Sequence, residues 1–257
     1  MPVLVLEDID KSFGGLKAVS NFNMTLEKGE IVGLIGPNGA GKTTVFNIIT
    51  GIYKPTAGKI TFLDQDITGM SPYMVCQRGI ARTFQNIRLF KDNSVLDNVR
   101  SIFHPRAGYG LFDAIFRTPR FRKNEREITD QAMELLEALG LVDRAGDKAA
   151  NLPYGAQRRL EIARALAGRP KLLLLDEPAA GMNPAEVVRM VDLIKYVKEK
   201  FDLTVLLIEH QMGVVMKLCE RLVVMDFGQI IATGLPAEIR NNPVVLEAYL
   251  GKGATVA

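Results

Sequence analysis

The chain has 257 residues, of which 47% are apolar and 24% charged, and its formal net charge is +3. This composition excludes a disordered chain, a collagen-like chain and a disulfide scaffold, and the charge is too small to indicate nucleic-acid binding. No uninterrupted run of apolar residues exceeds four, whereas a membrane-spanning helix needs about 20, so we expect no segment that crosses a bilayer.

The N-terminus and the cysteines favour a cytoplasmic protein. The first residues lack the basic region and long apolar stretch of a signal peptide. The two cysteines, Cys76 and Cys219, are too few for a disulfide framework and lack metal-ligand spacing. We therefore expect two buried or half-buried thiols in a reducing compartment.

The first third of the chain predicts strands around a glycine-rich segment. In the first two stretches apolar and polar side chains alternate loosely, which is typical of a half-solvated antiparallel sheet. Strands are expected at residues 3–13, 17–27, 30–35 and 58–63. Helices are expected from Lys42 to about Gly51 and from Ser71, where Pro72 suits a first turn.

The middle third has a helical pattern from Val95 to about Gly140, which suits a helix end. Its clearest part is one amphipathic face with apolar residues at helical spacing. The residues of this face are Ile128, Ala132, Leu135, Leu136 and Leu139. Before this helix we expect an irregular insert at about 104–124, rich in basic and aromatic residues.

The last third alternates strands and helices. Strands are expected at residues 172–175, 204–208, 222–226 and 229–233, and helices at 184–201 and 212–219. Because parallel strands need crossover connections, this alternation predicts a parallel α/β core. The middle helical block is then an insertion into that core and not a separate tethered domain.

Residues 36–43 read Gly-Pro-Asn-Gly-Ala-Gly-Lys-Thr and match the P-loop pattern G-x-x-x-x-G-K-[ST]. Glycines let the backbone N–H groups point into one hollow, and the following helix adds its positive end. Lys42 supplies a positive charge for the β- and γ-phosphates, and the Thr43 hydroxyl is placed to bind Mg²⁺. The residues expected to bind the nucleotide here are Gly36, Pro37, Asn38, Gly39, Ala40, Gly41, Lys42, Thr43 and Thr44.

Two adjacent acids follow the run of four leucines at 172–175. A nucleotide site needs an acid at the end of a buried strand, and Asp176 is predicted to hold Mg²⁺ through water. Glu177 is the next residue, so it can aim at a water molecule near the γ-phosphate. The alternative, a strand end that enters solvent, is much less favoured once the P-loop is present.

Several further residues follow these motifs in a recognisable order. They are Phe13 in Lys-Ser-Phe-Gly, Gln85 after an apolar stretch, the Leu-Pro-Tyr-Gly-Ala-Gln-Arg-Arg segment from Leu152, and His210 after a strand. With the P-loop and the Leu-Asp-Glu segment, this order resembles the ATP-binding subunit of ABC transporters. The resemblance covers about residues 3–251.

The resemblance implies a role for each residue. Phe13 would stack on adenine, although a lone phenylalanine is more often a core residue. Gln85 would sense Mg²⁺ and the attacking water, and Glu177 would be the general base or water-orienting carboxylate. His210 would contact the γ-phosphate, with a structural histidine as the alternative. The implied cofactors are ATP and Mg²⁺, and the implied metal ligands are Thr43, Gln85 and Asp176.

The implied fold is a P-loop NTPase of the RecA-like type. It has a core of mainly parallel sheet, an N-terminal antiparallel β subdomain and an inserted α-helical subdomain. One ABC ATPase domain would span residues 1–257, with the core at about 1–94 and 168–257. The helical subdomain, at about 95–167, would carry the signature region that faces the opposite protomer in a dimer. The signature residues are Pro153, Tyr154, Gly155, Ala156 and Gln157.

The sequence departs from the family pattern at two places. The usual Leu-Ser-Gly-Gly-Gln signature reads Leu-Pro-Tyr-Gly-Ala here, and Pro153 offers a phosphate neither a hydroxyl nor an N–H. Asn183 stands where an aspartate is usual. These changes, with the Ala-Ala-Gly-Met-Asn-Pro and Ile-Arg-Asn-Asn-Pro segments, resemble the ATPases of branched-chain amino-acid importers. They look like the longer, LivG-like subunit of the two.

The narrower resemblance implies partners and a location. The partners would be transmembrane permease subunits, a second ATPase subunit and, indirectly, an extracytoplasmic substrate-binding protein, without nucleic acid. A heterodimer is favoured and a homodimer stays open. The chain would lie in the cytoplasm, peripheral to the inner face of the membrane. Gln85 and the following residues 86–90 would form the groove that couples to the permease. Two interpretations of the insert at 104–124 are equally open. It could contact a permease or anionic headgroups, or it could be a solvated face.

Other functions are open to different degrees. ATPases for urea, lipopolysaccharide or other amino acids fit the same motifs. A soluble ABC ATPase acting on DNA or ribosomes usually has a long coiled-coil insert or two tandem units, whereas this chain has one P-loop and no heptad run. A small-molecule kinase or GTPase would need an acceptor site, and it would leave residues 152–165 and His210 unexplained.

Overall fold

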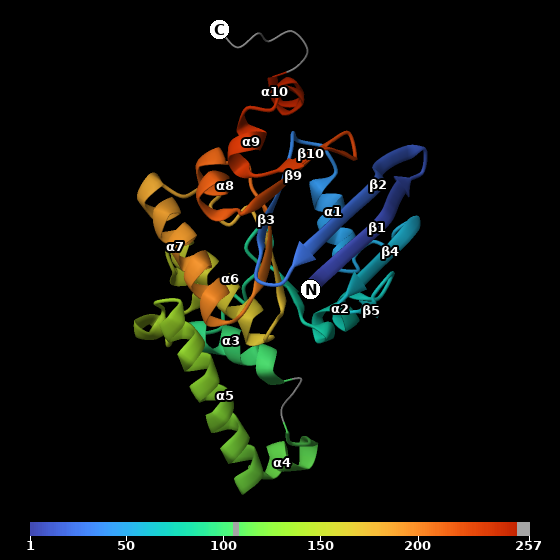
Figure 1. Ribbon diagram of the computed structural model, residues 1–257. Helices are drawn as coiled ribbons and strands as arrows, with labels where there is room; N and C mark the ends of the chain where they lie inside the picture. The colour runs from blue at the N-terminus through green and yellow to red at the C-terminus, as the bar shows by residue number, and fades with distance from the viewer. Residues whose placement is uncertain (105–107, 251–257) are drawn as a thin grey trace. The chain divides into compact units, whose positions relative to one another are not determined.

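The computed structural model of the chain describes residues 1–104 and 108–250. These residues form two compact units, one from Met1–Gln85 and the chain from Lys171 onward, the other from Asn86–Pro170. Residues 105–107 of the predicted insert and residues 251–257 of the predicted core lie outside the described residues. Figure 1 shows the elements of each unit.

The first unit contains a six-stranded sheet. Its strands are β3 (Ile31–Ile35), β6 (Ile80–Arg82), β7 (Leu172–Asp176), β8 (Thr204–Ile208), β9 (Arg221–Asp226) and β10 (Gln229–Gly234). They lie in the order β10-β9-β3-β8-β7-β6, and all neighbours are parallel except β9 and β10. Because parallel strands end at one edge of a sheet, the segments after β3, β6, β7 and β8 meet at that edge.

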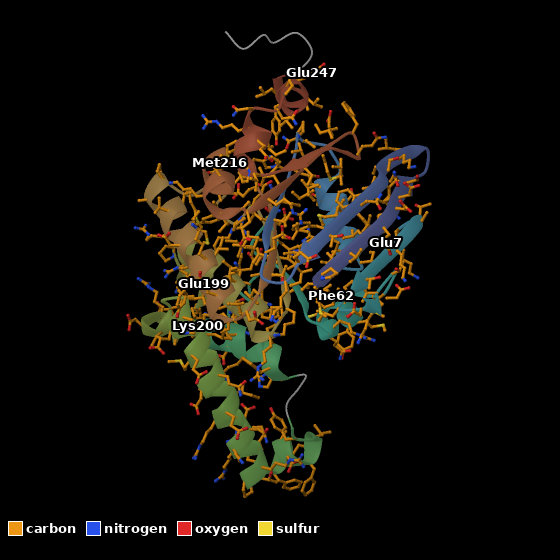
Figure 2. The ribbon with its side chains drawn as sticks, in the orientation of Figure 1. Glu7, Phe62, Glu199, Lys200, Met216 and Glu247 are labelled. Carbon is orange, nitrogen blue, oxygen red and sulfur yellow. The ribbon has the colours of Figure 1, made fainter. Side chains whose placement is uncertain are left out.

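A second sheet of the first unit is antiparallel and has the order β2-β1-β4-β5. Its strands are β1 (Pro2–Phe13), β2 (Leu16–Glu27), β4 (Ala57–Phe62) and β5 (Gln65–Asp66). One face is buried and the other meets solvent, as predicted. Phe62 is 2% exposed, whereas the side chain of Glu7 lies on the outer face (Figure 2).

Helix α1 (Lys42–Ile49) lies between the two sheets of the first unit (Figure 1). Its residues Phe46 and Ile49 are fully buried in a cluster that includes Leu6 of the antiparallel sheet and Leu174 of the parallel sheet. Apolar burial on both sides therefore fixes the position of α1. Since α1 follows β3 directly, the same packing fixes the loop between them.

The remaining helices of the first unit are α2 (Pro72–Arg78), α7 (Pro184–Lys200), α8 (Met212–Leu218), α9 (Pro236–Arg240) and α10 (Pro243–Leu250). The start of α7 shows why the predicted helix begins there. Pro184 occupies the first turn, and the Asn183 side chain accepts a hydrogen bond of 3.0 Å from the Glu186 backbone N–H. Asn183, noted above as a departure from the family pattern, thus caps a helix.

The second unit is helical. Its helices are α3 (Val95–Phe103), α4 (Leu111–Phe116), α5 (Pro119–Ala138) and α6 (Tyr154–Ala167). The predicted apolar face of α5 is confirmed, since Ala132 and Leu136 are fully buried. Helix α5 ends just before Gly140, which has a φ of 63°. Within the described residues, no helix is long and apolar enough to span a membrane.

The expectation of an irregular insert at 104–124 is wrong for most of its described part. Helix α4 and the first turns of α5 occupy this segment. The Thr118 hydroxyl accepts a hydrogen bond of 3.3 Å from the Phe121 backbone N–H, and Pro119 occupies the first turn of α5. A threonine cap followed by proline is a helix start signal, which the high density of basic and aromatic residues obscured.

The two thiols differ from each other. Cys219 is buried, and burial, together with the charges of Glu209 and Glu220, raises its pKa to about 12. Cys76 is exposed, so the expectation that both thiols are at least half-buried is wrong at this position. It lies on α2, where Val75 is the buried residue and the other side chains face outward.

Candidate nucleotide site

The P-loop joins β3 to α1 at the carboxyl edge of the parallel sheet. Gly36, Gly39 and Gly41 have φ values of 148°, 82° and 101°, which favour glycine. At Gly36 an added Cβ would lie 2.0 Å from the Met225 carbonyl oxygen, and at Gly41 2.6 Å from the Ala18 carbonyl oxygen. Two glycines of the motif are therefore required by space as well as by conformation.

Lys42 lies against the loop that precedes it. Its Nζ donates hydrogen bonds of 2.7 and 2.8 Å to the carbonyl oxygens of Gly36 and Pro37, and the residue is 6% exposed. Burial lowers the pKa of Lys42, while the charges of Glu177 and Asp176 act in the opposite direction. The ammonium group is thus held at the loop with both predicted acids near enough to act on it.

Asp176 lies at the end of β7, as predicted, and makes an ion pair that the sequence interpretation missed. Its Oδ2 atom accepts a hydrogen bond of 2.8 Å from Arg82 of β6, and both side chains are buried. Arg82 also donates to Asn47 Oδ1 of α1 at 2.6 Å. The guanidinium group therefore connects the P-loop helix to the acid at the end of the neighbouring strand.

Aromatic rings hold Arg82 in this position. Its guanidinium carbon lies 5.3 Å from the ring centroid of Phe46 and 5.0 Å from that of Phe84. Both distances are within the range of a cation–π contact. Phe84 directly precedes Gln85, so the same arginine contacts the segment that carries the predicted sensor residue. Sequence spacing gives no indication of the pair, because Arg82 and Asp176 are 94 residues apart.

Glu177 brings together the other two predicted catalytic residues. Its Oε2 accepts a hydrogen bond of 2.9 Å from Gln85 Nε2, and its Oε1 lies 3.0 Å from His210 Nε2. Glu177 has a φ of 49°, an uncommon backbone conformation for a residue other than glycine. Gln85 and His210, predicted separately from the sequence, thus both contact the carboxylate of Glu177, the residue directly after β7.

A second carboxylate, Glu209, supports this arrangement and was not predicted. It is 2% exposed, and its Oε2 accepts hydrogen bonds from the backbone N–H groups of His210 at 2.9 Å and Gln211 at 3.2 Å. Its Oε1 accepts a hydrogen bond of 3.1 Å from the backbone N–H of Ala179. Glu209 therefore links the turn of His210 to the segment that follows Glu177. An acid directly after the buried strand β8 is the sequence signal that indicates it.

Phe13, the predicted adenine-stacking residue, lies at the end of β1 and is 42% exposed. Its ring packs edge-on against Tyr53, with centroids 5.1 Å apart, and Lys11 Nζ lies 4.9 Å from its centroid. These contacts leave much of the ring accessible. They connect it to the segment after α1 and not to the P-loop itself, so adenine stacking stays a prediction.

The predicted metal ligands offer the chemistry that Mg²⁺ prefers. Thr43 is exposed and presents a hydroxyl, Asp176 a carboxylate, and Gln85 an amide oxygen. Oxygen donors of this kind, completed by water and phosphate, are typical of nucleotide-bound Mg²⁺. Within residues 1–104 and 108–250, no cluster of three or more His, Cys, Asp or Glu side chains suggests a metal site made by protein alone.

Comparison with known proteins agrees with this geometry. Residues 19–180 match the family model described as ABC transporter, and residues 229–255 match the model described as Branched-chain amino acid ATP-binding cassette transporter. LivG of Escherichia coli K12, a high-affinity branched-chain amino acid transport ATP-binding protein, is 47% identical over 98% of both chains. The chain belongs to the ATP-binding subunits of ABC transporters.

Other relatives place the whole chain in the same family. BraF of Pseudomonas aeruginosa, also a high-affinity branched-chain amino acid transport ATP-binding protein, is 44% identical over 98% of both chains. The crystal structure of MJ1267, an ATP-binding cassette of an ABC transporter in its ADP conformation, superposes with a TM-score of 0.85 at 35% identity. It covers 98% of this chain and 100% of that one. The expected fold, a P-loop NTPase with an antiparallel β part and inserted helices, is confirmed.

The signature region of this ABC ATPase starts α6 in the second unit. Pro153 is the N-cap, and its carbonyl oxygen accepts a hydrogen bond of 2.9 Å from the Ala156 backbone N–H. Pro153 and Tyr154 are exposed and Gly155 is half-buried, whereas Ala156 is 5% exposed. Gln157 turns back and donates to the Leu152 carbonyl at 2.8 Å. The backbone N–H groups of Tyr154 and Gly155, in the first helical turn, are those suited to an anion.

The segment 86–90, predicted as the coupling groove, is anchored by one buried asparagine. Asn98 is fully buried, accepts a hydrogen bond of 2.9 Å from the Phe90 backbone N–H, and donates one of 2.9 Å to the Phe90 carbonyl. The Phe90 ring is half exposed, with the Arg164 guanidinium 4.7 Å from its centroid. Burial lowers the pKa of Arg164, and Glu161 opposes this effect. An exposed aromatic ring is therefore held in a fixed place.

The C-terminal helix also reaches the P-loop, which the sequence interpretation did not foresee. Tyr249 of α10 lies close enough to the backbone of Gly36 to be affected by it. Burial raises the pKa of the Tyr249 phenol, and the Gly36 backbone acts against the rise. Tyr249 lies within the segment 229–255 that matches the branched-chain amino acid transporter model. That segment therefore brings a tyrosine near the nucleotide loop.

Proposed function

We propose that this ABC ATPase is the motor subunit of an importer of branched-chain amino acids. The similarity to LivG and BraF extends over nearly the whole chain, and the C-terminal segment matches a model specific to such transporters. For hydrolysis, the proposal depends on the contacts of Gln85 and His210 with the Glu177 carboxylate, which directly follows β7.

In the proposed reaction water attacks the γ-phosphorus of ATP. A bond forms between the water oxygen and phosphorus, the bond to the ADP oxygen breaks, and Glu177 accepts the water proton. Lys42 and the backbone of 38–43 stabilise charge on the phosphates, and His210 holds the γ-phosphate. Thr43, Asp176 and Gln85 would hold Mg²⁺, which would supply further charge stabilisation on the phosphates. Most of the catalysis is positioning and electrostatics.

The proposal includes the domain organisation and the partners. The unit 86–170 serves as the helical subdomain, with Phe90 and its neighbours contacting a transmembrane permease. Pro153 and Tyr154 face the nucleotide of a second, different ATPase subunit. Copurification and identification of bound proteins test the partners. Purified chain that forms an ATP-dependent homodimer with full hydrolysis would contradict the heterodimer.

The central test combines Glu177→Gln with transport. The complex, purified with its membrane partners and reconstituted in vesicles, is expected to move radiolabelled leucine in the presence of ATP. Glu177→Gln should bind ATP but hydrolyse it at least about a hundredfold more slowly, since a general base contributes roughly 10²–10⁴. Glu199→Gln, on the exposed side of α7, is the matched control and should turn over normally. Normal turnover in Glu177→Gln contradicts its role, and ATP-dependent movement of another solute contradicts the substrate.

A further inference from the structure

Helix α4 exposes an apolar face in the second unit. Leu111, Phe112, Ile115 and Phe116 are 79%, 68%, 66% and 65% exposed, and α4 has no buried residue. Their spacing places them on one face of the helix, with the rings of Phe112 and Phe116 4.6 Å apart. Scattered exposed apolar residues are ordinary, but four large ones within six residues form a contiguous patch, which marks an interaction surface.

The ends of α4 are held by specific hydrogen bonds. Asp113 accepts one of 3.2 Å from the Gly110 backbone N–H and another of 2.7 Å from the Thr118 hydroxyl. The Thr118 hydroxyl in turn caps α5. These contacts fix the turn between the two helices, so the outward direction of the α4 face follows from the local structure and not from fraying.

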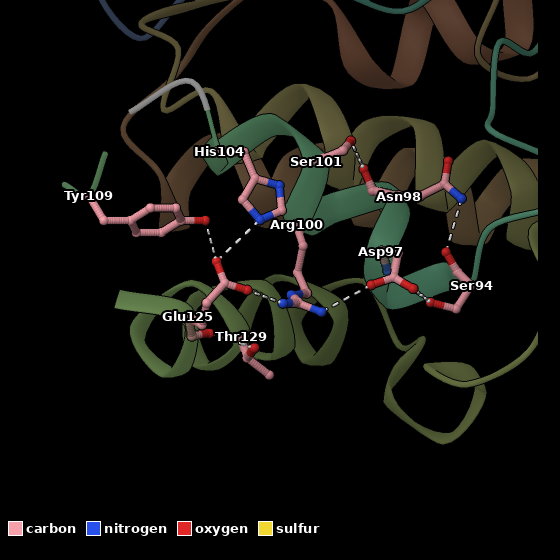
Figure 3. A network of polar contacts seen from close by, with 9 residues as sticks. All are labelled: Ser94, Asp97, Asn98, Arg100, Ser101, His104, Tyr109, Glu125 and Thr129. Atoms are coloured by element: carbon pink, nitrogen blue, oxygen red, sulfur yellow. Dashed lines mark hydrogen bonds and ion pairs between the residues drawn. The ribbon is translucent and has the colours of Figure 1, made fainter. Parts of the chain in front are cut away.

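A polar network fixes the base of this hairpin (Figure 3). Glu125 of α5 accepts hydrogen bonds of 2.6 Å from both Tyr109 and Arg100, and Arg100 also pairs with Asp97 at 3.0 Å. The Tyr109 ring packs edge-on against Phe121, with centroids 4.9 Å apart. The segment before α4 and the start of α5 are thus attached to α3, while the apolar face of α4 takes no part in these contacts.

Exposed basic side chains follow the apolar face directly along the chain. Between residues 108 and 126 the cations are Arg117, Arg120, Arg122, Lys123 and Arg126, and all are exposed. The acids of the same stretch are Asp113 and Glu125, and both are engaged in the contacts above. The outer surface at this point therefore combines exposed apolar and aromatic residues with positive charge, the combination that binds the interface of an anionic bilayer.

We propose that α4 and the first turns of α5 dock on the surface of a bilayer that contains anionic lipids. The α4 side chains enter the boundary between headgroups and acyl chains, and the cations of α5 contact lipid phosphates. A bilayer matches both properties of the patch at once, whereas apolar exposure alone would suit a protein groove. The inference draws on the proposed function only because a transporter subunit works beside a membrane.

Flotation with lipid vesicles tests the proposal. The purified chain should float with vesicles of phosphatidylcholine and phosphatidylglycerol in equal amounts, but not with phosphatidylcholine alone, and less so at high salt. Phe112→Ser with Phe116→Ser should abolish flotation. Arg120→Glu with Arg122→Glu should lower the partition coefficient by more than about tenfold, because each basic residue near an anionic surface contributes roughly fivefold.

Matched controls distinguish binding through this surface from non-specific binding to vesicles. Phe227→Ser removes an 88% exposed phenylalanine of the first unit, and Arg189→Glu with Lys195→Glu reverses two exposed cations of α7. Both should float as the wild type does. Circular dichroism and ATP binding of every variant should be unchanged, because the substituted side chains are exposed. A wild-type chain that floats but binds no ATP contradicts the proposed function and leaves the lipid surface supported.

Three outcomes would overturn the proposal. The first is equal flotation with neutral and anionic vesicles, and the second is undiminished flotation of the Phe112/Phe116 variant. The third is the absence of flotation of the wild-type chain together with α4-dependent binding to a detergent-solubilised transmembrane partner or to a second copy of the chain. That result would assign the same face to a protein partner.

Discussion

The nucleotide edge of the first unit and the α4–α5 hairpin of the second both contain carboxylates that accept hydrogen bonds from other segments of their unit. At the nucleotide edge these carboxylates, Asp176 and Glu209, are buried and follow strands of the parallel sheet. In the hairpin Glu125 is one-fifth exposed and joins helices. The two kinds of carboxylate therefore differ in what the loss of a partner costs. Water cannot replace the lost hydrogen bond of a buried carboxylate, whereas it can do so for a partly exposed one.

The largest effect is expected at the nucleotide edge from Lys42→Ala. The ammonium group is held against the loop by the carbonyl oxygens of Gly36 and Pro37, so its removal takes away the side-chain charge that we predict to contact the phosphates. ATP affinity should fall by at least about a hundredfold, as when a preorganised charge or donor is lost. Binding of a fluorescent ATP analogue measures it. Wild-type affinity in this variant would show that the backbone alone binds the phosphates.

Arg82→Met tests how much the buried ion pair at the nucleotide edge contributes to the stability of the fold. Removing the guanidinium leaves Asp176 buried without its partner, which should lower the free energy of unfolding by about 3–5 kcal/mol. Urea denaturation gives the value. The double variant Arg82→Met with Asp176→Asn removes the unpaired charge and should recover part of the loss. If the single variant unfolds at the wild-type urea concentration, the pair contributes nothing to the fold.

Glu125→Gln should produce the smallest effect. The Tyr109 and Arg100 bonds are partly solvent-exposed, so we expect a loss of about 1 kcal/mol in the free energy of unfolding at neutral pH. Burial alone would raise the pKa of Glu125, but the Tyr109 hydrogen bond and the Arg100 charge outweigh it, and the pKa lies below its usual value. The contribution is therefore present above the pKa of the unfolded chain and is lost as the pH falls through the lower, folded pKa.

Denaturation curves at several pH values check this sign. The difference between wild type and Glu125→Gln should shrink in acid and be constant around neutrality. Tyr109→Phe is the matched control, because it keeps the ring contact with Phe121 and removes only the hydroxyl. The pKa of Tyr109 is raised to about 12, so its own ionisation does not enter this range. A difference that grows in acid would contradict the direction given for Glu125.

The sequence predicted those parts of the site that local chemistry determines. The P-loop glycines are needed by backbone conformation and space, and Asp176 and Glu177 follow a buried strand, so both motifs can be read without the fold. Arg82 and Tyr249 could not be found in this way. Their partners, Asp176 and Gly36, are far away in the chain and meet them only through strand pairing or the packing of α10.

The hairpin shows the opposite difficulty. Its start signals, Thr118 and Pro119, are local and legible, but the density of arginine and phenylalanine around them indicates an irregular segment. Most of the basic and aromatic residues of this segment are exposed. Such a composition does not show whether the backbone that carries them is helical or irregular. Where a helix begins without buried residues, as α5 does before Ile128, capping residues are therefore a better guide than periodicity.

The contrast between the two thiols has a practical use. Cys219 is enclosed and keeps its proton far above neutral pH, whereas Cys76 is open to reagents, and the sequence contains no third cysteine. A maleimide dye or spin label should therefore attach at a single position of the unmodified chain, on the unit that carries the P-loop. Spectroscopy of nucleotide-driven motion can then begin from the natural protein, without a cysteine-free background.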